Sequence, residues 1–528
     1  MAKTLLLSHL RRLLRTAEKL QQNPNLSLEQ LEQRRNFLLQ GARLSLLALP
    51  ITPLLSACAS GGKFKNPDDP VIILGGGISG LTAAFYLAKA GIASHIYEAS
   101  ARVGGRMMTK TQFNSQAMFC ELGGEFVDSH HKDIMDLCQF FGIAMDPLET
   151  EDQGLATNLY YFKNNNSKDR KYFLDRDAIK MLQVFNKKYQ ADYARVQTDE
   201  GAKYFDQMTL EKYLDGYRSS VDTWFLEMLR IAYVGEMGLE ASEQSALLLV
   251  GTLSPSTENG FRVYGDSDQA LRIRGGNQAL ISNLEKWLLN HGVQIHKNLG
   301  LKSISENGSR LQMSFHNHKG VVQASKVICT IPFTVLRQIE SVMALPITEL
   351  RKAHIREMSY ATNSKIIQGY SARIWRTGIT ESKQFVPPSN GMVYTDLFSQ
   401  NIWETSRAQL GSFGILTNYL GGNDGANLVA ADGYEKCLSV VDQIFPGTRK
   451  LAQSERTSMN WSKNPFNLGS YGSARPNEIS KFASLGRQSE LGGKLLFAGE
   501  HVAPKFSGYM NGACLSGRLI AESVTATI

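Results

Sequence analysis

Cysteine is scarce in this sequence, and its scarcity excludes two classes of protein. Only 6 cysteines occur among 528 residues, and no two of them form a Cys-x-x-Cys pair. A disulfide framework and a cysteine-based metal site are therefore not expected, and we expect no metal at all. We expect the thiols to be mostly buried.

Two other features are missing. The apolar stretch over residues 44–55 is interrupted by Pro50 and Pro53, and it is too short to span a bilayer. The formal net charge is +8, but no basic segment interleaved with aromatic residues is present, so we expect no nucleic-acid partner. Part of the positive charge lies in the first residues, which we expect to be removed. We see no internal repeat.

A glycine-rich turn follows a short apolar run at residues 71–74, and an apolar-periodic segment follows the turn. This order of strand, turn and helix binds a dinucleotide pyrophosphate at the start of the helix. Gly75 permits the tight turn, Gly77 lets the backbone approach the phosphates, and Gly80 lets helix and strand pack closely. The expected cofactor contacts here are Gly75, Gly77, Ile78, Ser79 and Gly80.

An acidic residue stands where such a motif needs one. Residues 93–97 are predicted to form the second strand, and Glu98 ends it about 20 residues after the glycines, where a carboxylate accepts a hydrogen bond from a ribose hydroxyl. An acid at this position favours an adenosine with a free ribose over one that carries a 2′-phosphate.

The residues that follow resemble the flavin amine oxidase family. They are Glu98-Ala99-Ser100-Ala101-Arg102-Val103-Gly104-Gly105-Arg106 and Glu121-Leu122-Gly123-Gly124-Glu125-Phe126. In that family the first stretch wraps the phosphates of FAD, with arginine supplying paired donors. The resemblance implies further FAD contacts at Ala99, Arg102, Gly105, Arg106, Gly123, Gly124, Glu125 and Phe126.

The resemblance continues to the end of the chain. Residues 274–280 and 326–332 match two inner motifs of the family, and residues 496–501 and 508–513 match its most specific signature. The last of these opens a helix whose free N–H groups would face the flavin pyrimidine edge and stabilise negative charge there. FAD contacts are implied at Gly499, Glu500, Tyr509 and Met510.

The same resemblance implies three catalytic residues. Lys365 matches a lysine that holds a water near flavin N5 and assists reoxidation by oxygen. Tyr471 and Tyr509 match two aromatic residues that stand on either side of the substrate amine. Some members carry a flavin-linking cysteine just before the first tyrosine; Ser470 occupies that position, so we expect FAD to be held noncovalently.

We expect an α/β fold with two domains, because the length and the 43% hydrophobic content suit more than one core. The flavin motifs are spread along the chain, so the Rossmann-like FAD-binding domain must be assembled from discontinuous segments, 68–126, 262–335 and 456–528. A mixed α+β substrate-binding domain takes 127–261 and 336–455. Within it, residues 209–239 are predicted to form a packed helical subdomain.

Residues 1–58 are predicted to be a targeting segment. Gln33–Leu39 resembles a twin-arginine export motif, and Leu55–Cys58 resembles the lipobox of bacterial lipoproteins, in which the cysteine is acylated. We therefore expect an exported protein on the periplasmic or cell-surface side, anchored to the membrane through lipidated Cys58. The role of residues 1–33 is left open.

The resemblance implies an FAD-dependent amine oxidase. Such an enzyme oxidises a primary amine or an L-amino acid to the imine, which yields carbonyl product and ammonia, and it reduces O2 to hydrogen peroxide. A lipid-anchored dehydrogenase that passes electrons to quinone and a noncatalytic flavin-binding lipoprotein are the alternatives. Snake-type L-amino-acid oxidases place a carboxylate-binding arginine where this chain has Phe126, so the substrate stays open. So does the oligomeric state, a homodimer included.

Overall fold

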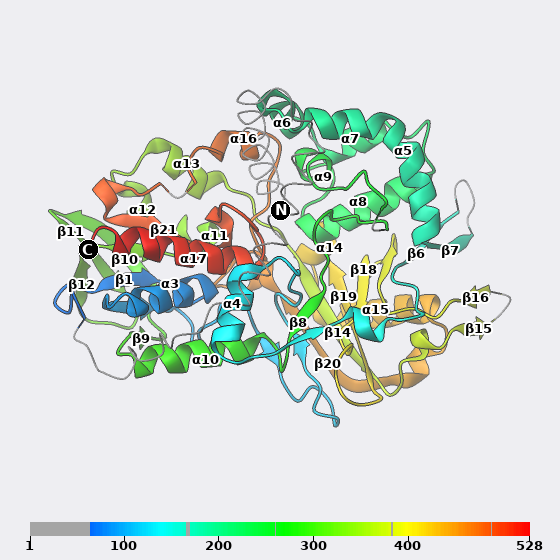
Figure 1. Cartoon of the computed structure of the whole chain (residues 1–528), viewed down its shortest axis with the longest axis horizontal. Helices are drawn as coiled ribbons and strands as arrows, with labels where there is room; N and C mark the ends of the chain where they lie inside the picture. The colour runs from blue at the N-terminus through cyan, green and yellow to red at the C-terminus, as the bar shows by residue number, and fades with distance from the viewer. Residues whose placement is uncertain (1–63, 165–168, 259, 382–383, 487) are drawn as a thin grey trace, which may run out of the picture.

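The computed structural model describes residues 64–164, 169–258, 260–381, 384–486 and 488–528. The predicted export motif at 33–39 and Cys58 lie outside the described residues. Two halves lie side by side, with the N-terminal and C-terminal parts of the described chain together in one of them (Figure 1). Among the described helices, none is both long and apolar enough to cross a membrane.

The first half is built on a parallel five-stranded sheet in the order β21-β13-β1-β2-β9. Its strands are β1 (Val71–Leu74), β2 (Ser94–Tyr97), β9 (Gln294–His296), β13 (Val327–Cys329) and β21 (Leu495–Phe497). All four residues of β1 are buried, as expected of a parallel strand that is covered on both faces. This sheet confirms the predicted Rossmann-like α/β fold.

Helices cover one face of this sheet. They are α3 (Ile78–Lys89), α4 (Lys132–Phe140), α10 (Asn277–Asn290) and α17 (Met510–Thr525). Their apolar side chains form one buried core with β1 and β13. Helices α3 and α17 come from opposite ends of the described chain and lie against each other (Figure 1).

The other face is covered by a three-stranded antiparallel sheet and short helices, which share a second core with it. These elements are β10 (Leu301–Asn307), β11 (Arg310–Phe315), β12 (Val321–Ala324), α11 (Phe333–Leu336), α12 (Glu340–Ala344) and α13 (Glu349–Glu357). Two small strand pairs lie nearer the second half: β3 (Thr109–Lys110) with β4 (Cys120–Glu121), and β5 (Met145–Pro147) with β8 (Leu271–Ile273).

The second half contains a seven-stranded sheet in the order β20-β14-β19-β18-β17-β6-β7. Its strands are β6 (Leu159–Lys163), β7 (Arg170–Leu174), β14 (Ser364–Tyr370), β17 (Val393–Thr395), β18 (Asn401–Glu404), β19 (Gly414–Leu420) and β20 (Ala452–Asn460). Neighbouring strands are antiparallel except β17 and β6. A separate hairpin pairs β15 (Ile379–Glu381) with β16 (Gln384–Val386).

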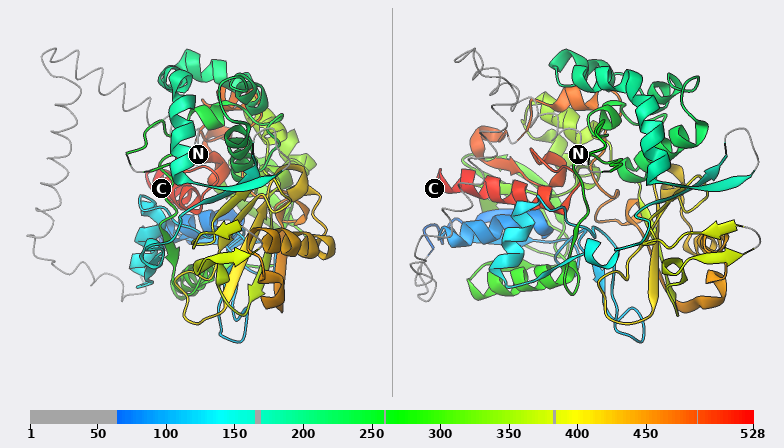
Figure 2. Two further views of the ribbon diagram at one scale, coloured as in Figure 1. Left: turned by 90° about the vertical axis from the view of Figure 1, so that its right-hand side faces the viewer. Right: turned by 45° about the vertical axis from the view of Figure 1, so that its right-hand side comes forward.

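Side chains of β6 alternate between the two faces of this sheet. Tyr160 and Phe162 join a helical core, whereas Leu159 and Tyr161 pack toward α15 (Ala430–Ile444) on the other face. Figure 2 shows the helical layer on one side of the sheet. That layer comprises α5 (Asp175–Arg195), α6 (Asp199–Asp206), α7 (Leu210–Asp215), α8 (Thr223–Met237) and α9 (Leu247–Val250), with α16 (Glu478–Phe482) beside α6; α14 (Gly422–Ala426) follows β19.

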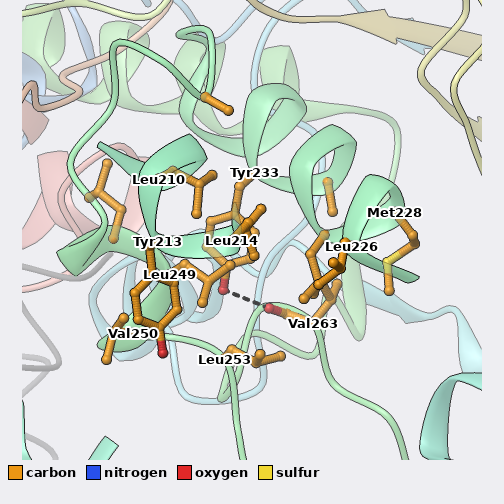
Figure 3. Packing of buried hydrophobic residues seen from close by; sticks show 14 of the residues in the cluster. Leu210, Tyr213, Leu214, Leu226, Met228, Tyr233, Leu249, Val250, Leu253 and Val263 are labelled. Carbon is orange, nitrogen blue, oxygen red and sulfur yellow. Dashed lines mark hydrogen bonds between the residues drawn. The ribbon is translucent and has the colours of Figure 1, made fainter. Parts of the chain in front are cut away.

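Aromatic and aliphatic side chains fill the interior of the helical layer. Leu214, Leu249 and Tyr233 meet there, and the Tyr233 hydroxyl donates to the Val263 carbonyl over 2.9 Å (Figure 3). The predicted helical subdomain at 209–239 is confirmed. Because α8 is buried along most of its length, its last turn is held in a fixed position.

Three segments differ from the expected domain boundaries. Helix α4 was assigned to the substrate domain, but its apolar face packs against α17 in the first half. Residues 336–358 contain α12 and α13, which also cover the five-stranded sheet. The boundary at 455/456 cuts through β20, a continuous strand paired with β14. In each case the packing of the segment determines the domain to which it belongs. These segments carry no nucleotide motif from which that domain could have been predicted.

The five described cysteines, Cys120, Cys138, Cys329, Cys437 and Cys514, are all buried and unpaired. This confirms the expectation of buried thiols. Burial raises the pKa of each, so all five stay protonated near neutral pH.

Candidate active site

A cavity of about 730 Å³ opens in the first half, beyond the carboxyl ends of β1 and β13. Ligands bind at this edge of a parallel sheet in doubly wound folds. Most of the predicted cofactor residues line it: Gly75, Gly77, Ile78, Ser79, Glu98, Ala99, Arg102, Gly105, Arg106, Gly123, Gly124, Gly499, Glu500, Tyr509 and Met510. Gly80, Glu125 and Phe126 do not.

The three glycines of the turn have different surroundings. Gly75 has φ +105°, and a Cβ on Gly80 would lie 2.1 Å from the Gly75 carbonyl oxygen, so both positions require glycine. A Cβ on Gly77 would meet no protein atom within 4 Å, because this residue faces the cavity. Gly80 therefore serves packing, and Gly77 leaves room for a ligand.

The start of α3 has unused hydrogen-bonding capacity. Gly77 caps the helix without a side-chain hydrogen bond, and the Ser79 hydroxyl is buried with no partner among the described residues. Free N–H groups at a helix start attract phosphate. The cavity therefore fits the pyrophosphate of FAD.

The Glu98 carboxylate closes the same turn. Its Oε2 accepts from the Gly76 N–H at 2.7 Å and its Oε1 from the Ser100 N–H at 2.8 Å. The side chain also borders the cavity. Glu98 thus shapes the turn, and a carboxylate oxygen can accept a second hydrogen bond, such as one from a ribose hydroxyl.

The two arginines do not both offer free donors to a phosphate. Arg102 directs its terminal nitrogens at the carbonyls of Val103, Gly105 and Met107, because the tight glycine turn leaves these acceptors without strand partners. Arg102 also borders the cavity, and its expected contact with phosphate stays a prediction. Arg106 donates through Nη1 to the Ser470 carbonyl at 2.7 Å and to Glu500 at 2.9 Å.

Glu500 connects three segments at the edge of the cavity. It accepts from Arg106, from the Gly472 N–H at 3.1 Å and from the Gly508 N–H at 2.9 Å. Burial alone would raise the pKa of this carboxyl, but Arg106, His501 and these donors hold it below its usual value. The ionised carboxylate thereby orders the loop that leads into α17.

A smaller cavity of about 170 Å³ adjoins the first one on the side of the second half. Eight residues border both: Gly123, Gly124, Lys365, Tyr419, Tyr471, Gly508, Tyr509 and Met510. Lys365 lies in β14, Tyr471 follows β20, and Tyr509 precedes α17. All three predicted catalytic residues therefore meet where the cavities join.

Lys365 is 3% exposed and makes three hydrogen bonds to the protein. Its Nζ donates to the Glu121 carbonyl at 3.0 Å, the Gly123 carbonyl at 2.8 Å and Glu125 Oε2 at 3.1 Å. These three bonds match the three donors of an ammonium group. The ammonium thus fixes the Gly123-Gly124 strip, and its proposed hold on a water stays a prediction.

Glu125 and Phe126 lie differently from the expectation of FAD contact. Glu125 is buried behind Lys365 and accepts from Trp403 Nε1 at 3.0 Å and Thr405 Oγ1 at 3.1 Å. Phe126 packs edge to face on Trp403 with ring centroids 5.7 Å apart. Both line the smaller cavity only, because the chain turns away from the larger one after Gly124.

The tyrosine hydroxyls converge on the end of α8. Tyr509 donates to Glu236 Oε1 at 3.0 Å, and Tyr471 donates to the Glu236 backbone carbonyl at 2.5 Å. The Tyr471 hydroxyl also lies 3.1 Å from that of Tyr419. Burial raises the pKa of the phenols of Tyr471 and Tyr509, so both remain neutral donors.

Sequence reasoning missed many residues of the smaller cavity, among them Glu236, Tyr394, Trp403 and Tyr419. The last three lie on strands of the second sheet, whose neighbours in space are far apart in sequence. One feature of the sequence could have indicated that Glu236 is functional: it is an acid close to the end of a helix that is otherwise largely apolar.

Three groups that can bind a metal lie together near this cavity: Asp128, His130 and His131, with ligand atoms within 4.8 Å of one another. Asp128 Oδ1 already accepts from Ser267 at 3.0 Å and the Gln269 N–H at 2.8 Å, and Oδ2 lies 3.2 Å from His131 Nε2. These contacts order the loop before α4. The expected absence of a metal stays a prediction.

A model of the flavin-containing amine oxidoreductase family matches residues 78–525. The L-amino acid oxidase bordonein-L of Crotalus durissus terrificus is 24% identical over 493 residues, covering 87% of each chain. Pseudooxynicotine dehydrogenase of Pseudomonas sp is 21% identical over 491 residues, covering 89% of this chain and 90% of that protein.

Solved structures share the fold. A putrescine oxidase bound to putrescine superposes with a TM-score of 0.71 at 18% identity, covering 87% of this chain and 99% of that one. A cyclohexylamine oxidase from Brevibacterium oxydans gives a TM-score of 0.69 at 16% identity, with the same coverage.

Proposed function

Because the chain belongs to the family of flavin-containing amine oxidoreductases, we propose that its larger cavity holds FAD and its smaller cavity the substrate of an amine oxidase. The enzyme is an FAD-dependent oxidoreductase that acts on amines. The observation that supports the proposed arrangement is the meeting of Lys365, Tyr471 and Tyr509 at the junction of the two cavities.

Different residues around the larger cavity bind different parts of FAD. The start of α3, with Gly77 and Ser79, faces the phosphates, and Glu98 accepts from a ribose hydroxyl. The start of α17 brings further free N–H groups to the flavin end, where they favour negative charge.

FAD is held noncovalently in this proposal. Ser470 stands at the position of the flavin-linking cysteine, and its hydroxyl donates to Asn363 Oδ1 at 2.8 Å. Acid precipitation of the purified protein should release free FAD into the supernatant. Yellow colour that stays with the pellet would contradict noncovalent binding.

FAD bound here would supply the redox chemistry: it would take a hydride from the carbon next to a neutral amine nitrogen, and O2, with one further proton from water, would take up the two electrons and the proton of that hydride as hydrogen peroxide. The chain positions the reacting amine. Tyr471 and Tyr509 border both cavities, and their hydroxyls donate to Glu236, which restricts the orientation of the two rings. The resulting imine is hydrolysed by water to carbonyl product and ammonia.

A dehydrogenase that passes electrons to a quinone is the second candidate, and a dehydrogenase among the relatives supports keeping it. The test is to mix the holoenzyme without oxygen with a panel of arylalkylamines, polyamines and L-amino acids, and to follow flavin bleaching. Re-admitting oxygen to the bleached enzyme, and in a separate sample a quinone, distinguishes the two acceptors. Failure of every amine and amino acid to bleach the flavin would contradict amine oxidation.

Export is also part of the proposal. The twin-arginine motif at residues 33–39 and the lipobox ending at Cys58 support a lipoprotein on the periplasmic or cell-surface side of a membrane. The twin-arginine route carries folded proteins, which suits a chain that must fold around FAD before it crosses.

A further inference from the structure

The smaller cavity has an acidic lining. Its charged residues, among those that the structure describes, are Glu125, Asp128, Glu236 and Lys365, and no arginine borders it. Lys365 is neutralised by Glu125 at 3.1 Å. Asp128 is satisfied by Ser267 and the Gln269 N–H. Glu236 is the remaining charge that faces the space.

Glu236 is available to a ligand. The side chain is partly exposed, and it borders the cavity. Its only hydrogen bond from a described residue comes from Tyr509, to Oε1. Tyr509 is also one of the two rings at the cavity junction, so a group bound to Glu236 lies beside the reacting position.

The position of Glu236 is rigid. It is the second-last residue of α8, one turn after Tyr233, whose hydroxyl is anchored to the Val263 carbonyl (Figure 3). The Tyr471 hydroxyl fixes the Glu236 backbone carbonyl from the other side. A carboxylate fixed in this way binds a cation with little loss of side-chain freedom.

We propose that Glu236 binds the cationic amino group of the incoming substrate and takes a proton from it before the adjacent carbon is oxidised, and that the substrates are amines that lack an α-carboxylate. A carboxylate in this cavity would face the charge of Glu236 and find no arginine among the described lining residues, whereas an ammonium gains a partner. This inference rests on the proposed amine oxidation. The proposed substrates therefore differ from those of the L-amino-acid oxidases that the chain resembles in sequence.

Matched substrate pairs test the inference on the unaltered holoenzyme. Tyramine and L-tyrosine differ only in the carboxylate, and so do cadaverine and L-lysine. In anaerobic rapid mixing, the amine that fits the cavity should reduce the flavin with a second-order rate constant at least about tenfold above that of its amino acid. Equal or faster reduction by the amino acid overturns the inference but leaves amine oxidation standing. If no compound reduces the flavin, the proposed function itself fails.

The variant Glu236→Gln tests the residue. It keeps the shape and the hydrogen bond from Tyr509 but removes the charge. We expect the dissociation constant of the amine, taken from the concentration dependence of flavin reduction, to rise at least about tenfold at unchanged FAD content. Glu227→Gln, on the same helix but outside the cavity lining, is the matched control and should bind the amine as the parent does. An unchanged dissociation constant in Glu236→Gln would remove Glu236 from substrate binding.

Discussion

The Nζ atom of Lys365 lies 3.1 Å from Oε2 of Glu125, and the two side chains are 4% and 2% exposed. The pair joins a strand of the second half to the glycine strip that borders both cavities. Trp403 and Thr405 complete the contacts of Glu125, so the carboxylate is held on three sides. Arg272 is a second buried cation near Glu125, with its Nη1 3.9 Å from Oε1, so loss of Lys365 leaves the carboxylate with the longer of its two ion pairs.

Substitution of Lys365 by methionine should affect the oxygen reaction most. If this cation assists reoxidation, Lys365→Met slows reoxidation by oxygen at least about tenfold, or roughly 1.4 kcal/mol in the barrier, and leaves anaerobic reduction comparatively intact. Rapid mixing measures both half-reactions. Slowing of reduction alone, or of neither step, would restrict Lys365 to a structural role. A quinone-dependent dehydrogenase would react slowly with oxygen already in the parent protein.

The same variant should lose stability, since Glu125 would stay buried without its nearer cationic partner and would keep only Arg272, at 3.9 Å. A loss of about 3–5 kcal/mol in the free energy of unfolding is expected from breaking a buried pair. Lys132→Met is the control, because the Lys132 side chain is 80% exposed and its pair with Asp136 contributes little. Equal denaturation midpoints for the two variants would contradict the importance of the buried pair.

Two substitutions in the glycine turn test cofactor binding and folding separately. Gly77→Ala should fold normally, because φ is −68° and no protein atom lies within 4 Å of the new Cβ, but it should weaken FAD binding by filling the cavity. Gly80→Ala should destabilise the fold itself, because its Cβ would lie 2.1 Å from the Gly75 carbonyl oxygen. Thermal unfolding of the apoproteins and fluorescence titration with FAD measure the two effects. Normal FAD affinity in Gly77→Ala would contradict the proposed phosphate site.

Replacement of Glu98 by alanine should weaken FAD retention. A hydrogen bond to a charged group is worth about 1.5–3 kcal/mol, and the Gly76 and Ser100 N–H groups also lose their acceptor. Glu98→Gln retains one acceptor oxygen for these groups and should lie between alanine and parent in FAD affinity. Equilibrium dialysis gives the affinities; identical values for all three proteins would place the ribose elsewhere.

Amine binding should depend on pH through Glu236. Burial raises the pKa of this carboxyl to about 7, despite the hydrogen bond from Tyr509. Below that pH the neutral acid attracts an ammonium weakly, so the amine dissociation constant should fall as the pH rises through about 7. Among the facing groups, burial raises the pKa of six tyrosines away from this range and lowers that of His131 to about 3. The tyrosines are Tyr233, Tyr264, Tyr394, Tyr419, Tyr471 and Tyr509. Burial also raises the pKa of Asp128, and Glu236→Gln separates its contribution from that of Glu236.

Glu236→Gln is the control for this dependence, since glutamine does not titrate. Its amine dissociation constant should vary little between about pH 6 and 8, the range in which the Glu236 carboxyl of the parent titrates. A parent-like pH profile in the variant would assign the dependence to another group.

The export proposal predicts a lipid anchor. Cys58→Ala should abolish labelling with radioactive palmitate and release the protein from the membrane fraction, because no other anchor is proposed. Cys514→Ala, which alters a buried thiol, should keep both properties. Membrane association of Cys58→Ala would require a different anchor.

The nucleotide turn could be predicted from sequence because its function depends on the backbone. Gly75 and Gly80 are required by a positive φ and by a close contact, and such constraints leave a local signature. The strand, turn and helix order then fixes the neighbouring residues. The same holds for the start of α17, where the motif is contiguous.

The smaller cavity could not be predicted in the same way. Trp403 and Tyr419 come from neighbouring strands, and Glu236 comes from a helix some 170 residues earlier in the chain than Trp403. Their meeting depends on the order of strands in the sheet and on how α8 packs against it. The carbonyl contacts of Arg102 could not be predicted for a related reason, because the loop carbonyls that accept from its guanidinium become available only in the folded turn.

Helix α17 packs on α3 so closely that a Cβ on Gly517 would lie 2.3 Å from the Ser79 carbonyl oxygen. The first helix of the nucleotide turn is therefore completed by the last 16-residue helix of the chain. Because α17 comes about 420 residues after α3 in the chain, the flavin site cannot close until that much of the chain has been synthesised. A chain that stops before α17 would leave the apolar side of α3 without its cover and exposed to quality-control proteases.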